Sequence, residues 1–71
     1  MAVRVLGTYE MANTGESFVE PFTQADGRKV FRAVFCGRHY DGTNIVFVPM
    51  SDWTFDLGEA CDAARLSASL S

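Results

Sequence analysis

Three side chains could ligate a soft metal ion or act in nucleophilic chemistry: Cys36, His39 and Cys61. Structural zinc sites use four protein ligands, so this set would need a carboxylate such as Asp41 to complete it. A cysteine beside a histidine is also the minimal pair for an activated thiolate. Cys36, however, alternates with valines in a pattern that is typical of a buried packing residue. We therefore expect no enzymatic activity, no metal site and no cofactor.

Acidic residues form a second group whose spacing suggests a function. Four of them follow one another at intervals of four, three and three positions: Asp52, Asp56, Glu59 and Asp62. On a helix this spacing would place the carboxylates in one row about 5–6 Å apart, comparable to the roughly 7 Å between phosphates along a nucleic-acid strand. Such a row could occupy a basic groove built for DNA or RNA. A solvated helix face has the same pattern, so the row is a hypothesis for a partner-binding surface.

Basic residues are concentrated in another segment. Positions 28 to 38 contain no acid and four basic side chains: Arg28, Lys29, Arg32 and Arg38. Interleaved with Phe31 and Phe35, they resemble a stacking platform for single-stranded nucleic acid. Strand alternation would place Arg32 on the opposite face from both phenylalanines. The net charge of −3 also disfavours attraction to polyanions. Nucleic-acid binding through this segment is therefore the alternative hypothesis.

The size and composition of the chain indicate one folded domain over residues 1–71. Apolar residues make up 48% of the 71 residues, which is enough for a core. A domain of this size nevertheless has little room for a deep pocket. The N-terminus lacks the apolar run of a secretory signal, and no segment approaches the roughly 20 apolar residues of a transmembrane helix. We expect a soluble, cytoplasmic protein that does not bind membranes.

Alternation of apolar and polar residues predicts four strands, over residues 2–9, 17–23, 29–36 and 44–48. Asp26-Gly27 and Asp41-Gly42 are typical of tight hairpin turns in which both central residues have positive φ. Pro21 cannot donate a ladder hydrogen bond, which places the second strand at a sheet edge or a bulge. We expect an antiparallel meander, either flat or curled.

A change to helical periodicity after Pro49 predicts one C-terminal amphipathic helix, and hence an α+β fold of order ββββα. Two starts are compatible with the pattern. The helix begins either near Ser51 or after Asp56, which would then be the N-cap with Glu59 as its capping-box partner. The apolar face of the helix would close one side of the sheet: Trp53, Leu57, Ala60, Cys61 and Ala64.

The third predicted strand is apolar on both sides, whereas a single helix covers only one face of a sheet. The second face could be covered if the sheet curls, if the chain forms a homodimer through the sheet, or if a partner docks there. A bare apolar face is the least compatible with a soluble monomer.

This pattern favours a binding protein over an enzyme. The leading hypothesis is a small inhibitor that docks on a larger protein or nucleoprotein complex through the acidic row. It would block a basic, nucleic-acid-binding surface of that partner. Phage and mobile-element inhibitors of the anti-CRISPR type are analogous in size and charge. A homodimer through the sheet is compatible with this function.

Overall fold

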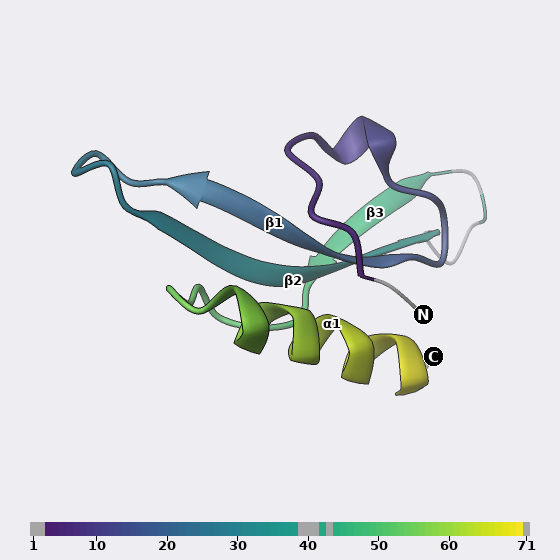
Figure 1. Cartoon of the computed structure of the whole chain (residues 1–71). Coiled ribbons are helices and arrows are strands. Elements are labelled where there is room, and N and C mark those ends of the chain that lie inside the picture. The colour runs from purple at the N-terminus through teal and green to yellow at the C-terminus, as the bar shows by residue number, and fades with distance from the viewer. Residues whose placement is uncertain (1–2, 39–41, 43, 71) are drawn as a thin grey trace.

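The computed structural model describes residues 3–38, 42 and 44–70 and has an α+β arrangement (Figure 1). A short 3-10 helix precedes three strands and one α-helix: η1 (Tyr9–Met11), β1 (Ser17–Thr23), β2 (Lys29–Arg38), β3 (Ile45–Pro49) and α1 (Leu57–Leu70). The strands form one antiparallel sheet in the order β1-β2-β3, and α1 packs against β1 and β2. The expected meander and C-terminal helix are confirmed, with three described strands in place of four.

The β1–β2 hairpin forms where the sequence predicts it, but its turn is of another type. The strand pairing ends at Thr23 and Lys29. Within the loop, the Gly27 N–H donates to the Gln24 carbonyl oxygen at 2.9 Å. Gly27 has φ +88°, whereas no described residue other than glycine has positive φ. Asp26 therefore does not adopt the left-handed conformation that a two-residue turn requires, and glycine alone accommodates it.

The side chains of β2 alternate between two cores on opposite faces of the sheet, as the sequence predicts. The face toward α1 buries one cluster: Val19, Ala33, Ala60 and Ala64. The second face buries another: Leu6, Phe18, Val34 and Cys36. Because successive strand residues point to opposite faces, the doubly apolar β2 contributes to both clusters.

The N-terminal segment is not the strand predicted over residues 2–9. Among its described residues, from position 3 onward, the backbone forms one parallel bridge, between Val5 and Val19, before it turns into η1. A strand here would have extended the sheet and left the second face open. Folding back across the sheet instead buries Leu6, which is 4% exposed, against the second face.

Contacts between aromatic rings stabilise the packing of the N-terminal segment on the second face of the sheet. The ring of Tyr9 stacks on Phe47 with centroids 4.3 Å apart and meets Phe18 edge-to-face at 5.8 Å. Both geometries are favourable for aromatic pairs. The cover reaches only one half of the second face, because the part near the β1–β2 turn extends beyond it (Figure 1).

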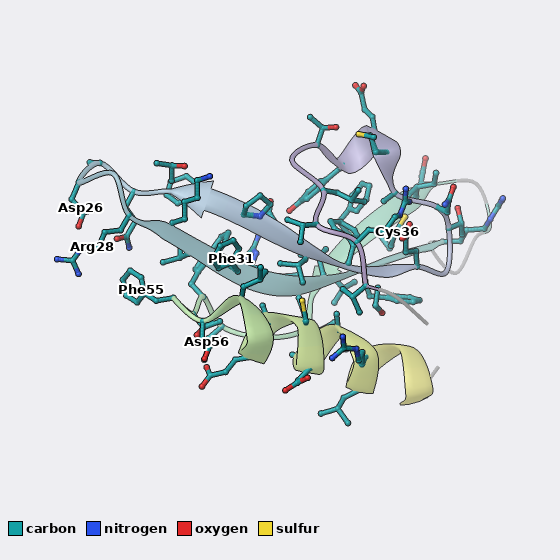
Figure 2. The ribbon with its side chains drawn as sticks, in the orientation of Figure 1. Asp26, Arg28, Phe31, Cys36, Phe55 and Asp56 are labelled. Atoms are coloured by element: carbon teal, nitrogen blue, oxygen red, sulfur yellow. The ribbon has the colours of Figure 1, made fainter. Side chains whose placement is uncertain are left out.

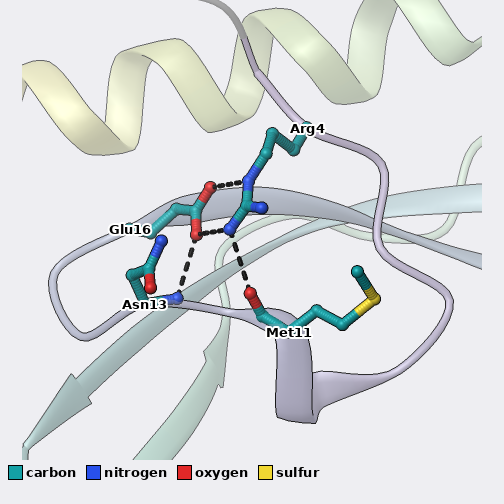
Figure 3. A network of polar contacts seen from close by, with 4 residues as sticks. All are labelled: Arg4, Met11, Asn13 and Glu16. Atoms are coloured by element: carbon teal, nitrogen blue, oxygen red, sulfur yellow. Dashed lines mark hydrogen bonds and ion pairs between the residues drawn. The ribbon is translucent and has the colours of Figure 1, made fainter.

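An ion pair fixes the N-terminal segment to the turn before β1 (Figure 3). Arg4 donates to both carboxylate oxygens of Glu16, from Nε at 2.7 Å and from Nη2 at 2.6 Å. Nη2 also donates to the Met11 carbonyl oxygen at 3.0 Å, and the Asn13 N–H donates to Glu16 at 3.0 Å. The bonds from Arg4, followed by that from Asn13, lower the pKa of the Glu16 carboxyl.

The lowered pKa of Glu16 predicts a pH-dependent contribution to stability. Since the unfolded chain holds this carboxyl at a higher pKa, the contribution is complete above that pKa and is lost as the pH falls through the folded-state pKa. We expect Glu16→Gln to lower the urea midpoint at neutral pH and to flatten the loss of stability between about pH 5 and pH 2. Urea titrations of both proteins across this range measure the effect, and parallel pH curves would contradict it.

Candidate protein-docking surface

The acidic row predicted on one helix is not formed, because α1 begins at Leu57. Asp52 lies in the segment between β3 and α1, and Asp56 directly precedes the helix. Only Glu59 and Asp62 are helical, and their spacing of three keeps them neighbours on the helix surface. All four acids are exposed. The surface position of the acids is thus confirmed, whereas the regular helical spacing holds for two of them.

Asp56 is the N-cap of α1, which confirms the second of the two predicted helix starts. Its Oδ1 accepts hydrogen bonds from the N–H groups of Gly58 at 2.8 Å and Glu59 at 3.4 Å. In a capping box the Glu59 side chain would accept a hydrogen bond from the Asp56 N–H. Here Thr54 bridges these two groups: its hydroxyl donates to Glu59 Oε2 at 2.9 Å and accepts from the Asp56 N–H at 3.1 Å. Two of the four acids therefore hold the start of the helix.

The other two acids differ in their surroundings. Asp62 Oδ1 pairs with Arg65 Nη1 at 3.0 Å on the exposed side of α1, where such a pair contributes little. Within the described part of the chain, the Asp52 carboxylate has no hydrogen bond or ion pair. Asp52 is thus the acid of the row whose side chain has no structural role among the described residues.

The N-cap assignment makes a prediction about stability. Replacing Asp56 with alanine leaves two helix N–H groups without an acceptor and should destabilise the fold by about 1 kcal/mol. Asp56→Asn keeps an acceptor oxygen and should recover most of this loss. Urea denaturation followed by circular dichroism compares the three proteins, and an equal loss in both variants would show that charge, rather than capping, is what matters.

The segment between β3 and α1 is extended and pairs with the N-terminal half of β2, on the side where β3 pairs with the C-terminal half. The Met50 N–H donates to the Ala33 carbonyl oxygen at 2.8 Å. Phe31 and Thr54 then exchange two backbone hydrogen bonds of 2.7 and 2.8 Å in an antiparallel bridge. Residues opposite one another in such a bridge face the same side, so Thr54 faces α1 with Phe31. Trp53, the preceding residue, contacts Phe22 and Arg32 and so faces the other side of the sheet.

Trp53 therefore lies on the second face, and the prediction that it joins the helix-side core is wrong. It is 42% exposed, and its ring centroid is 5.7 Å from that of Phe22. The guanidinium carbon of Arg32 lies 4.4 Å from the indole centroid, in cation–π contact. Leu57 is also exposed. The predicted helical face assumed a start near Ser51, which the backbone pairing of this segment with β2 prevents.

Five side chains form two contact groups near the β1–β2 turn, beyond the part of the sheet that the N-terminal segment covers: Trp53 with Phe22 and Arg32, and Phe55 with Arg28. Phe22 is 57% exposed and Phe55 is 59% exposed. The Arg28 guanidinium lies 5.9 Å from the Phe55 ring centroid, and Figure 2 shows this pair beside the β1–β2 turn. We refer to the following residues as the aromatic surface: Phe22, Arg28, Arg32, Trp53 and Phe55. Exposed apolar clusters of this kind are typical of binding sites.

An ion pair connects the aromatic surface to the covered part of the second face. Arg32 Nε lies 2.7 Å from Glu20 Oε1, both side chains are largely shielded, and the two residues are cross-strand partners. Tyr9 lies against this pair. Burial raises the pKa of the Tyr9 phenol, and its interaction with the Glu20 carboxylate adds to the rise. These contacts hold the Arg32 guanidinium in place over Trp53.

The four basic residues of the alternative hypothesis do not form one surface. Arg28 and Arg32 belong to the aromatic surface, and each is already paired with a carboxylate, at 3.3 and 2.7 Å respectively. Lys29 alternates to the helix-side face. Arg38 lies at the far end of β2, about 20 Å from Arg32 and about 33 Å from Arg28 at roughly 3.3 Å per residue. It donates to the Gly42 carbonyl oxygen at 3.2 Å.

The residues considered for metal binding or nucleophilic chemistry do not converge in the part of the chain that the structure describes. Cys36 is a buried packing residue, as predicted. Burial raises the pKa of its thiol, and the charge of Glu16 adds to the rise, which disfavours the thiolate. Cys61 is half-buried against the helix-side core. No three potential ligands gather among the described residues, and His39 and Asp41 lie outside them.

No protein-family model, curated protein sequence or solved structure matches the chain. The longest described helix, α1, has 14 residues. Neither α1 nor η1 has the length and apolar character that crossing a bilayer requires.

Proposed function

We propose that the protein is a small, non-enzymatic binding module that docks on a larger protein through its aromatic surface. The observation that carries the proposal is the exposure of Phe22, Trp53 and Phe55 near the β1–β2 turn, each in contact with another ring or with an arginine. Tryptophan and arginine are over-represented among the residues that dominate binding energy at protein interfaces, and aromatic residues are enriched there generally.

The backbone around the aromatic surface supports this function. β1 supplies Phe22, β2 supplies Arg32, and the segment paired with the N-terminal half of β2 supplies Trp53. Each of these segments is held by backbone hydrogen bonds to its neighbour. A preorganised surface loses little conformational entropy on binding, so more of the contact energy is available for affinity.

The charges favour a protein partner over a nucleic acid. Arg32 is held in a largely shielded ion pair with Glu20, so binding of this guanidinium to phosphates would have to replace that pair. Asp52 directly precedes Trp53 in the chain, and Asp56 directly follows Phe55. They supply an acidic rim to an aromatic centre. A partner with basic residues around an apolar contact area complements this arrangement.

Docking of this kind would cover the basic region of the partner. If that region binds DNA or RNA, the simplest consequence is inhibition, which retains the function expected from the acidic residues. The spacing of the acids in the sequence predicts an interface centred on the acidic residues, whereas we place its centre at the aromatic side chains. The acids then contribute mainly to the rate of association and to selectivity for a basic partner.

Quantitative affinity capture from native host cells with matched variants tests the proposal. The test variant is Phe22→Ser with Phe55→Ser, which removes two exposed rings from the aromatic surface. The control variant is Met11→Ser with Ile45→Ser, because these side chains are comparably exposed at other places. We expect at least one host protein that the original chain captures to be captured by the control variant and not by the test variant. Equal capture by both, with circular dichroism unchanged, would contradict the proposal.

The contribution of the acids can be measured separately. Asp52→Asn removes a charge of the acidic rim and leaves the Asp56 cap and Glu59 intact. We expect slower association with the captured partner and a weaker dependence of affinity on salt. An unchanged salt dependence would exclude Asp52 from the docking surface without affecting the role of the aromatic side chains.

A further inference from the structure

A concavity open to solvent adjoins Trp53 at the edge of the aromatic surface. Its volume is about 500 Å³, and six residues line it: Arg32, Pro49, Met50, Ser51, Asp52 and Trp53. Met50 and Trp53, both close to half exposed, give it apolar walls. The Met50 N–H and the Ser51 hydroxyl are both bonded to the backbone of Ala33, at 2.8 and 2.9 Å. The concavity is therefore shaped by backbone pairing before any partner arrives.

The fixed charges at the concavity sum to −1. Arg32 contributes +1, and its ion-pair partner Glu20 contributes −1 at 2.7 Å. Asp52 contributes a further −1, and its carboxylate has no partner in the described part of the chain. The Arg32 guanidinium is also engaged by the Trp53 ring at 4.4 Å. The uncompensated group on the wall is therefore a carboxylate, which attracts a cation.

We propose that this concavity receives a lysine or arginine side chain of the partner protein. The methylene stem would pack on Met50 and Pro49, and the cationic head would pair with Asp52 beside the indole. An acidic side chain would meet the Asp52 charge, and an apolar one would desolvate that carboxylate without a compensating partner. The inference rests on the proposed function and specifies the side chain that the partner uses as an anchor.

Nuclear magnetic resonance titration with a capped Gly-Lys-Gly tripeptide tests the proposal without the partner. The matched probe is the same tripeptide with norleucine, which retains an apolar stem and lacks the ammonium group. The Trp53 indole N–H and the Met50 methyl group report on the concavity. We expect saturable shifts of both signals with the lysine peptide, and weaker binding of the norleucine peptide.

Two variants of the protein complete the experiment. Asp52→Asn should weaken binding of the lysine peptide by roughly two- to fivefold, as for loss of an exposed ion pair. Asp62→Asn removes an equal charge from α1, away from the concavity, and should leave the affinity nearly unchanged. Equal binding of both peptides, equal effects of both variants, or no saturable shift would overturn the proposal. The titration reports on the concavity alone, so its failure is distinguishable from failure of the aromatic surface to capture a partner.

Discussion

Replacing Leu6 with alanine is expected to destabilise the protein by about 2–5 kcal/mol, as for other buried leucines. Leu6 is 4% exposed and completes the cluster around Phe18 on the second face. Domains of this length have a total stability of roughly 4–10 kcal/mol at 0.05–0.15 kcal/mol per residue. The variant should therefore lose a large share of its folding free energy, which urea denaturation followed by circular dichroism measures.

The adjacent residue supplies a matched control for this prediction. Val5 carries an apolar side chain of similar size but is 46% exposed, and its bridge to Val19 uses backbone atoms only. Val5→Ala should change the free energy of unfolding by roughly 0.5 kcal/mol or less. If Leu6→Ala cost no more than Val5→Ala, the N-terminal segment would not be the cover of the second face.

Trp53→Ala is expected to weaken binding to the captured partner by at least about 2 kcal/mol, or roughly 30-fold. The indole is the centre of the aromatic surface, since it contacts both Phe22 and Arg32. Its removal takes away contact area and also leaves the Arg32 guanidinium without its aromatic support. Isothermal titration calorimetry with the partner measures the loss.

Two further variants separate this interface effect from a general loss of structure. Trp53→Phe keeps an aromatic face under Arg32 and should restore a substantial part of the affinity. Leu66→Ala removes an exposed apolar side chain from α1 and should leave the affinity unchanged. A Trp53→Ala protein that binds as tightly as the original chain would contradict the placement of the indole at the interface.

The strands of the β1–β2 hairpin and the helix could be predicted because local chemistry determines them. The alternation of β2 assigns its side chains to two faces, and the glycine of Asp26-Gly27 adopts positive φ in the turn. Asp56 and Glu59 form the expected cap, extended by Thr54. In each of these cases neighbouring residues in the sequence supply the stabilising contacts.

The N-terminal segment could not be predicted in the same way. Alternation indicates which residues face the same side, but it does not show whether the backbone pairs with a strand. Residues 2–9 alternate well enough for a strand, yet in the structure Leu6 is buried against Phe18, Val34 and Cys36 on the second face. The deciding contribution is burial across more than ten positions of the chain, which no local pattern contains.

The aromatic surface depends on two pairings that the alternation of apolar and polar residues does not predict. Arg32 pairs with Glu20 across β1 and β2, and Thr54 pairs with Phe31, which turns Trp53 away from the helix. A signal for the second pairing was present. The run Trp53-Thr54-Phe55 consists of residues that favour strands, and Gly58 disfavours a long helix. These preferences together indicate an extended segment before the helix.

The most direct test of the proposed function is a map of amide chemical-shift changes in the labelled protein on addition of the unlabelled captured partner. Docking through the aromatic surface predicts the largest changes at Phe22, Arg32 and residues 53–55, with smaller changes at the acidic rim. Changes confined to Tyr9–Met11 and to the C-terminal half of α1, with the aromatic surface unaffected, would contradict it.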